Sequence, residues 1–97
     1  MLDTSRARLF ALVRDFAVTT PDWAQATRYQ TKPDEAYDLT LVAARVYGRR
    51  SEAMVIQAAA GLDSPELPLP ERILVLPTVA QLRALKQQAG YDDGEAR

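Results

Sequence analysis

Three carboxylates stand close together in the sequence, at Asp34, Glu35 and Asp38. Two carboxyl groups held about 5 to 10 Å apart can cleave a glycosidic bond, one of them acting as the acid. Acidic residues just before a helix are also explained by N-capping and by the attraction between negative charge and the helix dipole. A helical pattern follows Asp38, and we therefore predict capping rather than catalysis.

The residue types that the chain lacks exclude several kinds of chemistry. Its 97 residues contain neither Cys nor His. Disulfides, zinc sites built on these ligands, and Ser–His–Asp or Cys–His nucleophiles are therefore excluded. We predict no catalytic residue, no metal site and no cofactor, and we do not expect an enzyme.

The charged residues are balanced and dispersed. Twelve basic and thirteen acidic residues give a net charge of −1. No block of like charge is long enough for a nucleic-acid track or a polybasic membrane anchor. No apolar run approaches the roughly 20 residues that span a bilayer, and no signal-peptide pattern is evident. We expect neither a nucleic-acid nor a membrane partner, and a chain that is made in the cytoplasm.

The N-terminal third combines one long apolar pattern with one short strand pattern. Residues 4–18 (TSRARLFALVRDFAV) carry apolar side chains at helical spacing, although their β-branched and aromatic content leaves a strand as the alternative. Pro21 interrupts this pattern, and residues 26–32 are typical of a short, half-exposed strand. Trp23, the only tryptophan, either anchors the N-terminal segment to the core or binds a partner.

Two short helices are predicted in the middle of the chain. Residues 38–47 begin at Asp38, a good N-cap, and end at Gly48, which favours a left-handed C-terminal stop. Residues 52–60 follow the potential cap Ser51 and end at Gly61. Because so few residues connect them, the two helices should form a compact hairpin.

The C-terminal third predicts a loop, a strand and a helix. Residues 62–72 contain three of the six prolines, and residues 73–76 (ILVL) are typical of a buried strand that ends at Pro77. Thr78 and Gln81 have capping-box spacing. The helix that follows should bury one apolar face, and residues 92–97 form a polar tail. The residues of that face are Val79, Leu82, Leu85 and Ala89.

Three segments of the chain match a known pattern. Residues 36–48 (AYDLTLVAARVYG) resemble the "GDTLDLIAxRxYG" opening of a LysM-like module, residues 54–62 (MVIQAAAGL) its second helix, and residues 69–77 (LPERILVLP) its "LPxGxxLxLP" return strand. The chain thus resembles the LysM-like phage tail proteins, the tail protein X and baseplate families. The resemblance implies an α+β fold with a LysM-like βααβ core at residues 28–77, in which two helices pack on a two-stranded antiparallel sheet. An N-terminal extension (1–27), helical in part, and a C-terminal helix with its tail (78–97) would flank this core.

The resemblance also implies a function. The family members are structural components of phage tails and contractile injection systems, and this chain would be an adaptor that joins the tail tube to the baseplate or hub. Its partners would be other tail or baseplate proteins and copies of itself, in a homo-oligomeric ring such as a hexamer. It would be located in the virion tail or baseplate, after assembly in the host cytoplasm.

The sequence departs from the family where glycan-binding members contact their ligand. Ala36 and Tyr37 replace the Gly-Asp of the first loop, Ala60 replaces the Asn of the second, and Glu71 replaces a loop Gly. These changes favour the structural role. The alternative is a module that binds peptidoglycan, a polymer containing N-acetylglucosamine. Its ligand would contact Tyr37, Asp38, Leu62 and Asp63.

The predicted partner-binding residues are of two kinds. The basic cluster at the end of the first helix provides charges that would determine the specificity and register of partner binding more than its affinity. Aromatic and apolar side chains on the loops and flanks provide the buried contacts, because the core cannot cover every apolar stripe. The basic residues are Arg45, Arg49 and Arg50, and the others are Tyr37, Trp23, Leu82 and Leu85. Tyr47 is expected to cover the edge of the core, with its hydroxyl reaching water.

Overall fold

The computed structural model describes residues 2–91, with side chains from residue 4 onward, so the predicted tail at 92–97 lies outside the described residues. Within this range the chain forms four α-helices, two 3₁₀ turns and a two-stranded antiparallel sheet. The elements are α1 (Leu2–Thr19), β1 (Thr27–Gln30), η1 (Pro33–Glu35), α2 (Leu39–Tyr47), η2 (Arg50–Glu52), α3 (Ala53–Ala60), β2 (Ile73–Leu76) and α4 (Val79–Ala89).

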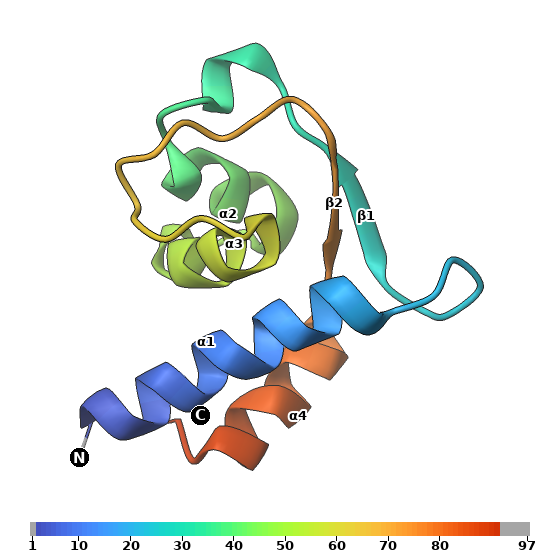
Figure 1. Cartoon of the computed structure of the whole chain (residues 1–97), viewed down its shortest axis with the longest axis vertical. Coiled ribbons are helices and arrows are strands. Elements are labelled where there is room, and N and C mark those ends of the chain that lie inside the picture. Colours follow the sequence, from blue (N-terminus) through green and yellow to red (C-terminus); the bar gives the residue numbers. More distant parts are fainter. Residues whose placement is uncertain (1, 92–97) are drawn as a thin grey trace.

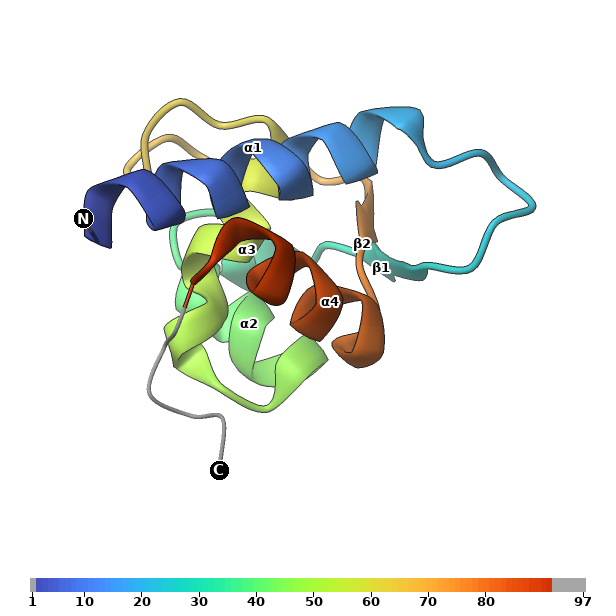
Figure 2. The ribbon, with the colours of Figure 1, turned by 90° about the horizontal axis from the view of Figure 1, so that it is seen from below.

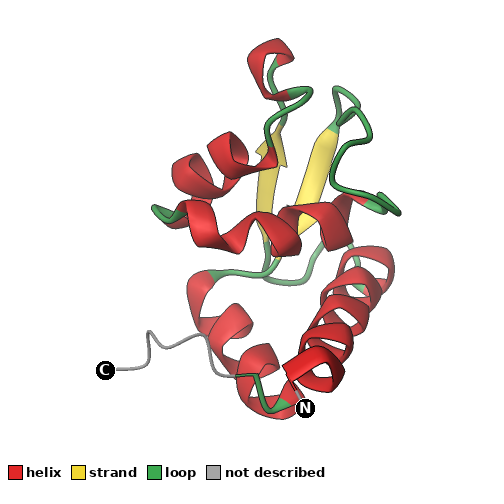
Figure 3. Cartoon of the chain, turned by 90° about the vertical axis from the view of Figure 1, so that its left-hand side faces the viewer, coloured by secondary structure: helices red, strands yellow, loops and turns green. Residues whose placement is uncertain are grey.

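The strands β1 and β2 enclose a helical hairpin in the sequence and pair beside it in space. Their register runs from Thr27 opposite Leu76 to Gln30 opposite Ile73. Figure 3 shows the α2–α3 hairpin lying across the sheet. The predicted α+β class and antiparallel sheet are confirmed, and the order of elements is compatible with a βααβ arrangement.

The helices α1 and α4 close the other side of the core. They pack against each other, and α1 also packs against α3 and β2 (Figures 1 and 2). Leu9 and Val13 of α1 are fully buried in the same apolar cluster as Ile56 of α3. The N-terminal segment is therefore a helix, and the strand alternative for it is wrong.

Local capping signals set the helix boundaries largely as the sequence predicts. The Asp38 side chain accepts a hydrogen bond from the Leu41 amide, and Gly48 ends α2 in the left-handed region with φ 73°. Thr78 and Gln81 form the predicted capping box at the start of α4. The predicted cap Ser51 is wrong, because this residue lies inside η2 and the N-cap position of α3 belongs to Glu52.

One apolar side chain in β2 and one in α4 are exposed, although the sequence patterns predict that both are buried. Ile73 is 59% exposed, whereas Leu74 and Leu76 are buried. A sheet with helices on only one of its faces leaves alternate side chains in solvent, so β2 is not a fully buried strand. Val79, in the first turn of α4, is 56% exposed and does not join the buried face of that helix.

The two leucines of α4 that were predicted to contact a partner belong to the core. Leu82 is 4% exposed, and Leu85 is partly buried against the same apolar cluster. This face of α4 covers the core, so Leu82 is not available to a partner. The assignment of Leu82 to a partner surface is corrected accordingly.

The packing of α1 predicts a large effect of truncating its buried face. Leu9→Ala should lower the free energy of unfolding by about 2–5 kcal/mol, because it removes a fully buried side chain and leaves a cavity. The matched control on the same helix is Val18→Ala, at a position 78% exposed, which should change stability by less than about 0.5 kcal/mol. Urea titration followed by circular dichroism measures both. Equal stability of Leu9→Ala and the wild type would contradict the docking of α1 described above.

Candidate functional site

A buried carboxylate connects three segments at one end of the sheet. Glu35 in η1 is 0% exposed. Its Oε2 accepts hydrogen bonds from the Tyr29 hydroxyl of β1 and from Arg45 Nη1 of α2, the latter at 2.7 Å. Its Oε1 accepts one from the Lys32 amide at 2.7 Å. Both oxygens of the carboxylate therefore accept hydrogen bonds, as a buried charge requires.

These donors decide how Glu35 titrates. Burial by itself raises the pKa of a carboxyl group, but the hydrogen bonds from Tyr29, Arg45 and Lys32 outweigh it, and the pKa of Glu35 lies below its ordinary value. A general acid needs the opposite shift. The geometry thus assigns Glu35 to holding the fold together.

Arg45, the first predicted partner-binding charge, is also used within the chain. Its guanidinium contacts Asp34 through Nη1 at 3.2 Å and Nη2 at 3.0 Å, in addition to Glu35. The hydrogen bond from Arg45 is the main reason that the pKa of Asp34 is lowered. Because the Arg45 side chain is 36% exposed, a partner could reach only part of it.

The other two predicted arginines differ in their surroundings. Arg50 is exposed and donates to the Thr40 hydroxyl at 2.9 Å, and that hydroxyl donates in turn to Asp38. The hydrogen bond from Thr40 is the main cause that lowers the pKa of Asp38, opposed by burial. Arg49 approaches the buried carboxylate of Glu52 at 3.2 Å. Of the three arginines, Arg50 is thus the one that donates to a neutral hydroxyl rather than to a carboxylate.

Glu52 forms a second buried carboxylate contact that the sequence did not predict. It is 6% exposed, and its Oε2 accepts a hydrogen bond from Lys86 of α4 at 2.7 Å. The contact ties the start of the α3 segment to the last turns of α4. No local signal reveals it, because Glu52 and Lys86 lie 34 residues apart.

Tyr47 is a structural residue, as predicted. Its hydroxyl donates to the Pro77 carbonyl at 2.7 Å, which joins the end of α2 to the end of β2. The hydroxyl does not simply point to water. Burial, followed by the negative charge of Glu52, raises the pKa of Tyr47.

The residues of the glycan alternative lie on two loops that are fixed to each other. Tyr37 is 78% exposed in the loop before α2, next to the capping residue Asp38. In the loop after α3, Leu62 is half-buried, and the side chain of Asp63 is 91% exposed and lies 3.9 Å from Arg14. The Leu69 amide donates to the Ala36 carbonyl at 2.7 Å, so the long second loop is held against the first.

Thr31 strengthens the same connection between the loops. Its hydroxyl donates to the Pro70 carbonyl at 2.8 Å and accepts from the Arg72 amide at 2.9 Å. The Thr31 side chain is buried, so both hydrogen bonds are shielded from water. These hydrogen bonds thus hold the two loops together beyond the end of the sheet.

Trp23 occupies a protruding loop that other residues hold in place. The indole is 88% exposed, so the predicted anchoring of Trp23 to the core is wrong. The Arg28 guanidinium donates to the carbonyls of Pro21 at 2.9 Å and Ala24 at 3.2 Å, and the Gln81 side chain donates to the Gln25 carbonyl at 2.9 Å. The loop is therefore ordered while its largest apolar side chain stays in solvent.

The described part of the chain offers few other chemical features. Within residues 2–91, no helix is both long and apolar enough to cross a membrane, and no cluster of three or more acidic side chains is arranged to hold a metal ion. Comparisons with protein-family models, with curated proteins and with solved structures gave no match.

The buried Glu35 carboxylate predicts a pH-dependent contribution to stability. Because its pKa is lowered from 4.5 in the folded state, the contribution is complete above about pH 4.5 and is lost as the pH falls through the folded pKa. Glu35→Gln should therefore cost about 3 kcal/mol at neutral pH. The difference from the wild type should shrink as the solution is acidified.

The control for this experiment is Glu71→Gln, which neutralises an exposed carboxylate in the loop before β2. Thermal unfolding of the three proteins between neutral and acidic pH separates the effects. A stability difference between Glu35→Gln and the wild type that stays constant across this range would contradict an ionised Glu35 in the fold.

Proposed function

We propose that this protein is a LysM-like structural component of a phage tail or contractile injection system. It acts there as an adaptor that joins the tail tube to the baseplate or hub through protein–protein contacts, without chemistry. Its partners are tail or baseplate proteins and further copies of itself in a ring. It is assembled into the virion tail or baseplate in the host cytoplasm.

The order and boundaries of the central elements support the LysM-like part of the proposal. The segments that resemble the family occupy α2, α3 and β2, and each ends at the residue that the family pattern marks. Gly48 and Gly61 end the helices in the left-handed conformation, and Pro77 follows the return strand. The fold class alone is shared by many unrelated functions, so these positions add only to the sequence resemblance.

The observation that carries the binding role is the exposure of Trp23. Tryptophan is rarely left in solvent, and it is enriched among the residues that dominate the energy of protein–protein interfaces. Here it is 88% exposed on a loop that Arg28 and Gln81 hold by hydrogen bonds. An ordered loop loses little conformational entropy when a partner binds, which favours a docking role.

The peptidoglycan alternative rests on a different observation, the exposed ring of Tyr37. An aromatic ring beside the Asp38 carboxylate could stack on a sugar face and orient a hydroxyl group. Against this stand the changes in the ligand loops, where Ala36, Ala60 and Glu71 replace residues of the family pattern. We therefore favour the structural role.

The proposed function predicts that the chain is part of an assembled particle. In cells that produce the tail or injection machine encoded alongside this chain, sedimented intact particles should contain it in a fixed ratio to the tube protein. Mass spectrometry of the particles measures this ratio. Trp23→Ala should lower the amount incorporated at least tenfold, because one hot-spot residue is worth about 2 kcal/mol or more. Val18→Ala, at a position that is 78% exposed near the end of α1, should have no effect.

The alternative is tested on the isolated chain with insoluble peptidoglycan. We expect the wild type to stay in the supernatant, together with Tyr37→Ala. Retention of the wild type in the pellet that is lost in Tyr37→Ala would contradict the structural role and support glycan binding through the loop before α2.

A further inference from the structure

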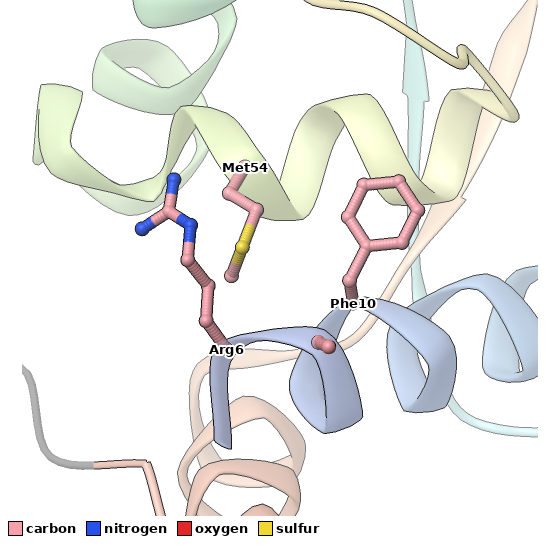
Figure 4. A pocket seen from close by; sticks show the side chains of 4 residues that line it. Arg6, Phe10 and Met54 are labelled. Carbon is pink, nitrogen blue, oxygen red and sulfur yellow. The ribbon is translucent and has the colours of Figure 1, made fainter. Parts of the chain in front are cut away.

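A surface hollow separates the N-terminal half of α1 from the start of α3. It has a volume of about 330 Å³ and is lined by Arg6, Ala7 and Phe10 of α1 and by Met54 of α3. Figure 4 shows the side chains of Arg6 and Met54 side by side at one end and the ring of Phe10 at the other. Arg6 and Ala7 are exposed, so the hollow is open to solvent.

The lining of the hollow suits a flat aromatic ring. A guanidinium group stacks favourably on the face of an aromatic ring, and indole is the best such ring among the side chains. A thioether makes favourable contacts with ring edges, and a second aromatic ring packs in offset or edge-to-face geometry. Arg6, Met54 and Phe10 thus each provide a contact that an indole would use.

The chain carries such a group at the opposite end of α1. Trp23 follows the end of α1, and its loop projects at the far side of the molecule from the N-terminal half of the helix (Figure 2). With a rise of 1.5 Å per residue, Arg6 and Thr19 are about 20 Å apart along the helix, so the indole cannot fill the hollow of its own chain.

We propose that Trp23 of one copy docks into the hollow between α1 and α3 of a second copy. Charge complementarity supports this occupant, because Asp22 precedes the indole on an exposed loop and Arg6 lines the hollow. The contact joins two different surfaces, so unless two copies exchange it reciprocally in a closed dimer, it propagates from copy to copy until a ring closes. The inference rests on the proposed function, which requires contacts between copies.

The size of the contact sets its expected strength. An indole buries at most about 250 Å², whereas a stable interface buries about 800 Å² per partner. The free chain should therefore associate weakly, with a Kd in roughly the high-micromolar to millimolar range. Closure of a ring, or attachment to a tail, raises the effective concentration and strengthens the same contact.

The single tryptophan makes the contact directly measurable in the full chain. With rising protein concentration, the fluorescence of Trp23 should shift to the blue and become less accessible to iodide, while sedimentation velocity shows growing oligomers. Ala7→Glu fills the hollow with a charged side chain and should weaken association at least tenfold. The matched control is Ala84→Glu, at an exposed position on α4, which should associate like the wild type. Circular dichroism melting establishes that both variants are folded.

Complementation separates a head-to-tail contact from any other self-association. Trp23→Ala retains the hollow and Ala7→Glu retains the indole, so each alone should stay monomeric, while a mixture of the two should form heterodimers that grow no further. A wild type that remains monomeric with a fully exposed indole at the highest concentration, or an Ala7→Glu variant that associates as strongly as the wild type, would overturn the proposal. If these tests fail but sedimented particles still contain the chain, the inference is wrong and the proposed function stands.

Discussion

The negative charge of Glu35 is buried where β1, η1 and α2 meet, and an unpaired carboxylate there would cost several kcal/mol. The three donors come from three segments: the Tyr29 hydroxyl, the Lys32 amide and the Arg45 guanidinium. The loss of any one of them would leave the buried charge with fewer hydrogen bonds. These segments must therefore be in place together, and this carboxylate holds α2 beside the sheet together with the hydrogen bond from Tyr47 to Pro77.

The flanking helices α1 and α4 provide apolar packing that the sheet and the α2–α3 hairpin lack on their own. A two-stranded sheet is marginally stable without further packing, and α1 and α4 supply it by burying Leu9, Val13 and Leu82 with the sheet and α3. The contact between Glu52 and Lys86 adds a charged tie between α4 and the hairpin. Once the flanks are part of the core, the surfaces left for partners include the loop that carries Trp23 and the hollow between α1 and α3.

Sequence patterns predicted the features that depend on near neighbours. Asp38, Gly48 and Thr78 form hydrogen bonds with residues only a few positions away. Their roles at the helix ends could therefore be predicted from the spacing of residues in the sequence. The role of Arg45 could not, because its partners come from a preceding segment whose position depends on the fold. Leu82 shows the same limit for apolar residues. Helical periodicity gives the face on which a side chain lies, but whether the protein itself or a partner covers that face is a tertiary property.

The order in which the core residues are synthesised has a consequence for how this chain folds. Leu9 and Val13 leave the ribosome early, but they pack with α3, β2 and α4, which follow much later. Likewise, β1 has no strand to pair with until β2 has been made. Until β2 and α4 have been made, the apolar face of α1 therefore lacks two of the elements that it packs against. A fragment that ends before β2 would leave both this apolar face and the edge of β1 without a partner, and such exposed surfaces favour aggregation.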